Sequence, residues 1–193
     1  WFGWFGFNGG SQLALGSAAD AAAMANVYVN TNMAACGGLV AAMILASLLY
    51  GKVDLTLALN GALAGLVSIT AGPDVATPLQ AILIGAIGGI LCTLAIPLLD
   101  KLKIDDVVGA ISVHLVAGIW GTLVVGIPGL NGSGDFMTQL IGVVVIGVFV
   151  TVVSAIVWLV LKAVTGLRPS EEEEMTGLDV SELGMEAYPE FRN

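Results

Sequence analysis

Residues 105–121 read DDVVGAISVHLVAGIWG and contain the only histidine of the chain, His114. No charged residue follows Asp106 until Asp135, so the apolar run is long enough to cross a lipid bilayer. Eight residues at about 1.5 Å each place His114 roughly 12 Å inside such a span. An ionisable side chain at that depth is costly, which makes His114 a candidate for a pore or a proton relay. A neutral histidine that hydrogen-bonds a neighbouring helix is the alternative.

The residues around His114 carry little side-chain volume. Ala110, His114 and Gly118 are four residues apart and would share one face of an α-helix, with Gly121 close to it. A neighbouring helix or a small solute could therefore approach the imidazole. Asp105 and Asp106 stand where this helix should begin, a position at which carboxylates interact favourably with the helix dipole.

The composition indicates an integral membrane protein. Of the 193 residues, 57% are hydrophobic and only 11% are charged, against about 25% charged in soluble domains. Because unpaired backbone cannot face lipid, we expect an all-α, polytopic membrane helix bundle. Its membrane part is residues 1–166, and residues 167–193 form an acidic tail. The expected spans are one truncated helix, residues 1–16, and five complete helices, residues 21–51, 55–72, 78–99, 107–127 and 136–164.

Two features bear on completeness and on enzyme function. The chain begins at Trp1, without a methionine and within an apolar stretch, so we expect a fragment of a longer protein. Cys36 and Cys92 lie in apolar runs and form no metal or redox motif. Since the sequence also lacks a nucleophile arrangement and a cofactor motif, we expect neither an enzyme nor a bound cofactor or metal.

The basic residues predict the orientation in the membrane. All six lie at the end of an even-numbered expected span or after it, whereas residues 72–77 and 128–135 contain no lysine or arginine. The positive-inside rule then assigns the basic face, and the C-terminal tail with it, to the cytoplasm. Residues 168–193 hold eight acids and two bases, which argues against nucleic acid and anionic lipid headgroups as partners. The six basic residues are Lys52, Lys101, Lys103, Lys162, Arg168 and Arg192.

A row of aromatic and hydroxyl side chains follows the start of the chain. Trp4, Phe7 and Ser11 are three or four residues apart and would line one helix face. An aromatic belt at the membrane interface is one interpretation. The other is a vestibule for a cation, because aromatic faces attract cations and a hydroxyl accepts one of their hydrogen bonds.

Four motifs, in this order, resemble the ammonium transporter (Amt/MEP/Rh) family over nearly the whole chain. They are WFGFNGGS at residues 4–11, NGALAGLV at residues 60–67, Asp105-Asp106 followed by His114 and AGIWG at residues 117–121, and the tail from Gly177-Leu178-Asp179 to Glu186-Ala187-Tyr188. The resemblance implies the second inverted repeat and the final helix of an eleven-helix protomer, assembled as a homotrimer in the plasma membrane.

The resemblance also implies roles for single residues. His114 is similar to the second of two pore histidines, Phe7 to a phenylalanine of the outer gate, and Ser11 to the hydroxyl that meets ammonium outside. Trp4 resembles an aromatic residue beside the conduction path. One departure concerns the ion-binding field: many members carry an acid at the position of Gly109. Two further departures, Leu115 and Leu183, affect the function less.

The function that follows is transport of ammonium or ammonia. Ammonium would be recruited outside and deprotonated, and ammonia would cross an apolar, histidine-lined pore. A membrane-bound ammonium sensor with the tail as its output is the alternative. A neutral-gas channel of the Rh type is a third, but the resemblance of the Gly177-Leu178-Asp179 tail favours the Amt branch. The family resemblance further implies that the tail docks on the cytoplasmic face, where a P-II signalling protein could close the pore; a disordered acidic tail is the competing interpretation.

Overall fold

The computed structural model describes residues 1–186 and 188–191 and divides the chain into two compact units, Trp1–Val145 and Ile146–Asn193. Ala187 and Arg192, which enter the tail motif and the charge pattern, lie outside the described residues, as does the side chain of Phe191. The functional boundary expected at residue 166 stays a prediction, because the two units divide the long last helix by geometry alone.

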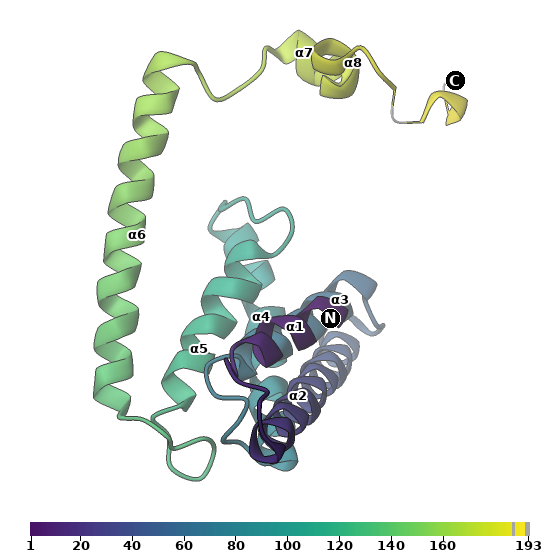
Figure 1. Ribbon diagram of the computed structural model, residues 1–193. Helices are drawn as coiled ribbons and strands as arrows, with labels where there is room; N and C mark the ends of the chain where they lie inside the picture. Colours follow the sequence, from purple (N-terminus) through teal and green to yellow (C-terminus); the bar gives the residue numbers. More distant parts are fainter. Residues whose placement is uncertain (187, 192–193) are drawn as a thin grey trace. The chain divides into compact units, whose positions relative to one another are not determined.

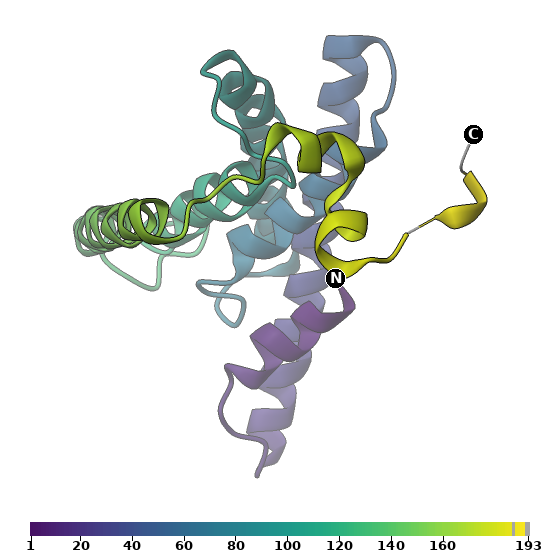
Figure 2. The same cartoon turned by 90° about the horizontal axis from the view of Figure 1, so that it is seen from above.

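The first unit is built from helices (Figures 1 and 2). Three helices of the described chain, α2, α4 and α6, are long and apolar enough to cross a membrane, and two shorter apolar helices, Leu55–Ile69 and Ala110–Val124, lie between them in the sequence. The number of spans therefore stays a prediction. The helices are α1 (Phe2–Gly10), α2 (Ala18–Tyr50), α3 (Leu55–Ile69), α4 (Pro78–Lys101), η1 (Ala110–Val116), α5 (Ala117–Val124) and α6 (Phe136–Val164), which continues into the second unit.

Local sequence explains where the helices begin and end. Ser17 and Asp20 form a reciprocal capping box at the start of α2, and Thr77 and Gln80 form another at the start of α4. The side chain of Asp54 accepts the N–H of Leu57 and so caps α3 by a single hydrogen bond. Each cap satisfies backbone N–H groups that have no partner within the helix, which fixes the entry of these three helices.

Helices α2, α3 and α4 pack against one another and form the centre of this unit. Glycines permit the contact: a Cβ on Gly65 of α3 or on Gly85 of α4 would overlap the same atom, the main-chain oxygen of Ala34 in α2. The spacings Gly61-x-x-x-Gly65 and Gly85-x-x-x-Gly89 predict such close helix packing, and the structure confirms it. We call this contact of α2, α3 and α4 around Ala34 the glycine junction.

Side-chain amides hold the loops at one end of the first unit. Asn26 donates to the carbonyl of Asp74, Gln80 donates to that of Gly129, and Asn131 donates to that of Gly72. Asn30 is fully buried and donates to the carbonyls of Pro73 and Ala76. The two loops without basic residues, 72–77 and 128–135, therefore lie together, as alternation of the spans predicts.

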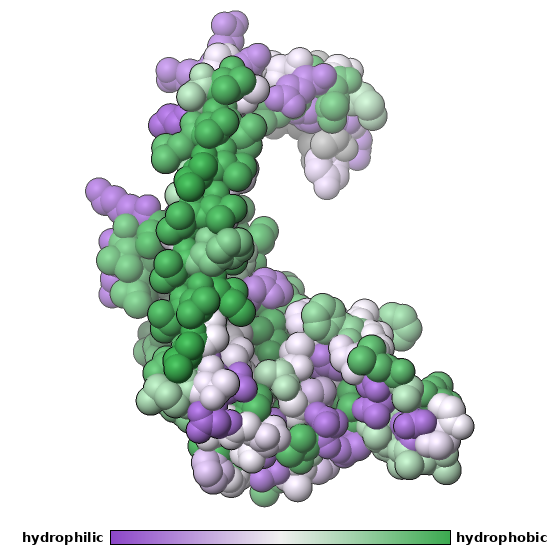
Figure 3. All heavy atoms as spheres, turned by 60° about the vertical axis from the view of Figure 1, so that its left-hand side comes forward, coloured by the Kyte–Doolittle hydropathy of each residue, from purple (hydrophilic) through white to green (hydrophobic). Residues whose placement is uncertain are grey.

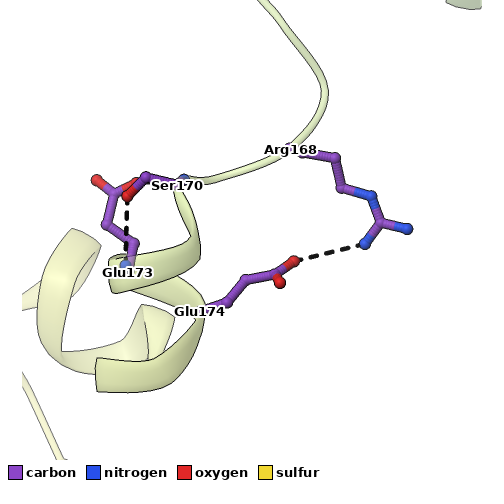
Figure 4. A network of polar contacts seen from close by, with 4 residues as sticks. All are labelled: Arg168, Ser170, Glu173 and Glu174. Atoms are coloured by element: carbon purple, nitrogen blue, oxygen red, sulfur yellow. Dashed lines mark hydrogen bonds and ion pairs between the residues drawn. The ribbon is translucent and has the colours of Figure 1, made fainter.

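The second unit contains the rest of α6, then α7 (Glu171–Thr176), α8 (Leu178–Leu183) and the short η2 (Pro189–Phe191). Exposed apolar side chains cover the surface of α6, which is the green column in Figure 3. Ser170 and Glu173 cap α7 reciprocally, and Arg168 and Glu174 approach to 3.6 Å at exposed positions (Figure 4). Hydrogen bonds from the Ser170 N–H and hydroxyl hold the pKa of Glu173 below its ordinary value. The acidic run thus begins a capped helix.

Candidate functional site: an aromatic hollow beside His114

The segment that carries His114 is not a regular α-helix. Gly109 has a left-handed backbone (φ +76°), and residues Ala110–Val116 form a π-helix that continues as α5. The expectation of one helix over residues 107–127 with α-helical spacing around His114 is therefore wrong. A π-helix pairs residues five apart, so Ala110 and His114 are offset from the common face that α-helical spacing gives. Such segments are frequent at functional sites.

Asp106 holds the start of this π-helix. Its carboxylate accepts the N–H of Ile111 and the N–H of Ser112, each at 3.0 Å, and the Ser112 hydroxyl at 2.6 Å. Desolvation raises the pKa of Asp106, but these hydrogen bonds outweigh it, and the pKa lies below its ordinary value. The structure confirms that Asp106 marks a helix N-terminus. It also shows that Ser112, two residues before His114, is hydrogen-bonded to the Asp106 carboxylate.

The three predicted ring residues come together in one place. The Trp4 and His114 rings are nearly parallel, 11° apart with centroids 6.3 Å apart, and Trp4 stacks on Phe7 at 5.3 Å. They line an open hollow of about 520 Å³, which we call the aromatic hollow. Its remaining lining residues are Val67, Thr70, Ala71, Gly118, Gly121 and Thr122. The small residues that flank His114 on its C-terminal side thus leave room beside the imidazole.

Ser11 lies apart from the lining of this hollow. It ends α1, is exposed, and its hydroxyl donates to the carbonyl of Phe7 at 3.0 Å. Three of the four predicted site residues, Trp4, Phe7 and His114, therefore line the aromatic hollow, and Ser11 stands one turn beyond Phe7.

Two threonines line the hollow that the sequence analysis did not predict as site residues. Thr70 accepts a 2.8 Å hydrogen bond from the indole N–H of Trp4, and Thr122 lines the hollow from α5. Thr70 is the C-cap residue of α3 and stands 66 positions from Trp4 in the sequence. No local spacing relates the two residues, so only the fold reveals the pair.

The chemistry of the hollow suits a small solute that can be a cation or a neutral base. Aromatic faces attract a cation, whereas imidazole nitrogens and threonine hydroxyls can accept or donate hydrogen bonds. Within residues 1–186 and 188–191, no group of three or more histidine, cysteine, aspartate or glutamate side chains is arranged to hold a metal ion. The rings and hydroxyls are therefore the groups from which a function can be argued.

The sequence model described as the Ammonium Transporter Family matches residues 1–188. The ammonium transporter Amt2 of Archaeoglobus fulgidus is 40% identical over 99% of this chain and 44% of that protein.

Solved structures share the fold as well. A protein named Sensor Amt Protein superposes with a TM-score of 0.86 at 39% identity, over 94% of this chain and 46% of that one. Mep2 of Candida albicans gives a TM-score of 0.80 at 28% identity, over 99% and 46%. The likeness confirms the predicted all-helical membrane fold. The chain spans less than half the length of each of these three proteins.

Proposed function

Because this chain belongs to the ammonium transporter family, we propose that the protein moves ammonium or ammonia across a membrane through the aromatic hollow beside His114. One observation carries the proposal: the rings of Phe7, Trp4 and His114 follow one another along a single open hollow. Its relatives are named as transporters, and none of the chemistry described above requires an enzyme.

The proposed mechanism begins with recruitment of the cation. Ser11 offers a hydroxyl oxygen, and the exposed faces of Phe7 and Trp4 attract positive charge. An ammonium ion that leaves water for an apolar passage loses its hydration at large cost, whereas ammonia loses far less. Ammonium therefore gives up a proton, which the neutral imidazole of His114 accepts for relay, and ammonia passes on.

His114 acts in the apolar part of the passage. A neutral imidazole donates at one ring nitrogen and accepts at the other, so it can hydrogen-bond ammonia and take part in relaying the released proton. Potassium ions have the charge of ammonium but no proton to release. The mechanism accordingly conducts ammonium and rejects potassium, because only ammonium can become neutral.

The test replaces His114 by alanine in the full-length protein, reconstituted in lipid bilayers. His114→Ala should abolish or strongly alter the ammonium current, or change its selectivity over potassium. Trp120→Phe is the matched control, because Trp120 lies in the same stretch but outside the lining of the hollow and donates to the carbonyl of Ile84. Unaltered current and unaltered selectivity in His114→Ala would refute the role of His114.

An ammonium sensor is the second candidate function. It is supported by the likeness to the protein named Sensor Amt Protein, and the same vestibule residues would serve it. A sensor binds ammonium without sustained current, whereas a transporter carries current for as long as a gradient exists. Electrophysiology on the reconstituted full-length protein, combined with a binding measurement, separates the two.

The proposal extends to assembly and location. The protein forms a homotrimer in the plasma membrane, with residues 1–166 in the bilayer and residues 167–193 in the cytoplasm. The distribution of lysine and arginine supports this orientation. The tail docks on the cytoplasmic face and there responds to a P-II signalling protein. Exposed apolar side chains on the tail helix α8, Leu178 and Leu183, support docking over disorder.

A further inference from the structure

The hydroxyl of Thr70 has both of its roles filled. It donates to the carbonyl of Leu66, one turn back in α3, at 2.7 Å, and it accepts the indole N–H of Trp4 at 2.8 Å. A threonine hydroxyl has one proton and two lone pairs, whereas an indole N–H can only donate. Because the hydroxyl proton is directed to the carbonyl of Leu66, a lone pair of the oxygen is free to accept the indole N–H of Trp4 in α1.

This hydrogen bond fixes a ring that stacking alone leaves adjustable. Trp4 lies between Phe7, at 5.3 Å, and His114, at 6.3 Å, and offset aromatic stacking tolerates a broad range of centroid distances. A hydrogen bond is directional and weakens steeply away from linearity. The indole edge is therefore pinned at Thr70 while its face borders the aromatic hollow.

The arrangement is specific to one of the two half-buried indoles of the first unit, Trp4 and Trp120. Trp120 donates to a main-chain carbonyl, that of Ile84, and it lies outside the lining of the hollow. Trp4 instead depends on a side chain, and that side chain itself lines the hollow beside His114. One hydroxyl thus connects the end of α3, the indole of α1 and the space next to the imidazole.

We propose that Thr70 is a positioning residue that holds the Trp4 indole against the hollow, sets the space beside His114, and so discriminates ammonium from larger alkylammonium ions. The inference rests on the proposed transport function. Without the hydroxyl, the indole N–H lacks its partner, and the ring turns toward other acceptors. The hollow then widens at the point where a methyl group on the substrate would otherwise be excluded.

The transport experiment compares ammonium with methylammonium in the full-length protein in lipid bilayers. Thr70→Val keeps the shape of the side chain and removes the hydroxyl, and Thr70→Ser keeps the hydroxyl. Thr70→Val should raise the ratio of methylammonium to ammonium transport by roughly three- to tenfold, the range that loss of one neutral hydrogen bond permits. Thr70→Ser should leave the ratio near that of the unaltered protein.

Thr93→Val is the matched control. The Thr93 hydroxyl donates to the carbonyl of Gly89 at 2.8 Å, the same one-turn bond that Thr70 makes to Leu66, but Thr93 is buried in α4 away from the hollow. The control therefore removes an equivalent helix bond without touching Trp4. It should leave the methylammonium ratio unchanged.

A structural measurement tests the positioning itself. Fluorine NMR of 5-fluorotryptophan in the full-length protein reports each indole, and Trp4→Phe identifies the Trp4 resonance. Thr70→Val should shift or broaden this resonance and leave that of Trp120 in place. An unmoved Trp4 resonance in Thr70→Val overturns the role of Thr70 whatever transport does.

The remaining outcomes also decide. If Thr70→Val does not fold, Trp4→Phe removes the same hydrogen bond from the other side, and an unchanged methylammonium ratio there overturns the proposal. In the Trp4→Phe background, Thr70→Val should add nothing further to the ratio, and an additive effect would contradict coupling through the indole. An unaltered protein that carries neither ion refutes the proposed transport function and, with it, the selectivity; the indole resonance still decides separately whether Thr70 positions Trp4.

Discussion

The glycine junction and the aromatic hollow lie in the same unit and follow opposite rules. In the junction, Gly65 and Gly85 leave no space, because even one Cβ would overlap the main-chain oxygen of Ala34. In the hollow, rings and hydroxyls surround about 520 Å³ of open space. The close packing of the junction depends on glycines that have no Cβ. The shape of the hollow depends on directional bonds such as the hydrogen bond between Trp4 and Thr70.

The difference teaches where a substitution should act. A change in the junction displaces backbone and should affect the stability of the fold before anything else. A change in the hollow leaves the helices packed and should affect which solute fits. Close packing also borders the hollow at Gly121, which lines it and whose missing Cβ leaves room for the main chain of Ser68 in α3.

Gly85→Ala should have the largest effect on stability. A variant as stable as the unaltered protein would contradict the contrast between the glycine junction and the aromatic hollow. The new Cβ would overlap a backbone atom of α2, which cannot yield as the tip of a side chain can, so we expect destabilisation of about 3 kcal/mol. The apparent melting temperature in detergent measures it. Gly118→Ala is the control: its Cβ would lie 3.7 Å from Val67, an ordinary contact, so the melting temperature should hardly change.

Asp106→Ala should have the next largest effect. The change removes the acceptor of three hydrogen bonds at the start of η1 and should cost about 2 kcal/mol. Because η1 carries His114, ammonium transport should fall together with stability. Asp106→Asn keeps one acceptor oxygen and should lie between the two proteins in thermal melting. Equal melting of all three would show that the cap is dispensable.

Trp120→Phe should have a smaller effect, of about 1 kcal/mol, because it removes one neutral hydrogen bond, to Ile84, from a packed site. In this variant the stability should fall while the ratio of methylammonium to ammonium transport stays constant, which would separate packing from selectivity. A changed ratio would mean that the packed region also sets selectivity.

The pH dependence of Asp106 should be the smallest effect under ordinary conditions. Its pKa is lowered in the folded protein, so its stabilising contribution is complete above its ordinary value of 3.8 and is lost as the pH falls through the lower folded value. Melting temperatures from about pH 5 down to about pH 3 should therefore fall more for the unaltered protein than for Asp106→Asn. Parallel curves would contradict the lowered pKa.

The sequence predicts the junction better than it predicts the hollow. Four-residue glycine spacing indicates close helix contact whatever the partner is, and the partners are backbone atoms that every helix supplies. The spacing of Trp4 and Phe7 and the isolation of His114 within an apolar run also predicted three of the ring positions. These signals are local, and each rests on one helix.

Thr70 and the π-helix could not be predicted in that way. Thr70 reaches Trp4 from another helix, and a threonine at a helix end is ordinary in any sequence. The π-helix depends on the left-handed backbone at Gly109 and on the hydrogen bonds of Asp106, whereas periodicity arguments assume 3.6 residues per turn. Where a side chain bonds to a side chain of another helix, or where the helix changes its pitch, the sequence pattern contains no signal.

Because residues Ala110–Val116 form a π-helix, the number of residues in this segment determines its hydrogen-bond pairing as much as their identity does. Removing Ile111 would let the segment relax to α-helical pairing while both ends stay anchored, by Asp106 on one side and α5 on the other. A π-helix carries one more residue than the α-helical segment that spans the same ends, so the residues after the deletion, His114 among them, would keep their place. Such a shortened protein would keep the imidazole at the hollow and lose only the extra residue, a change that no exchange of one amino acid for another would produce.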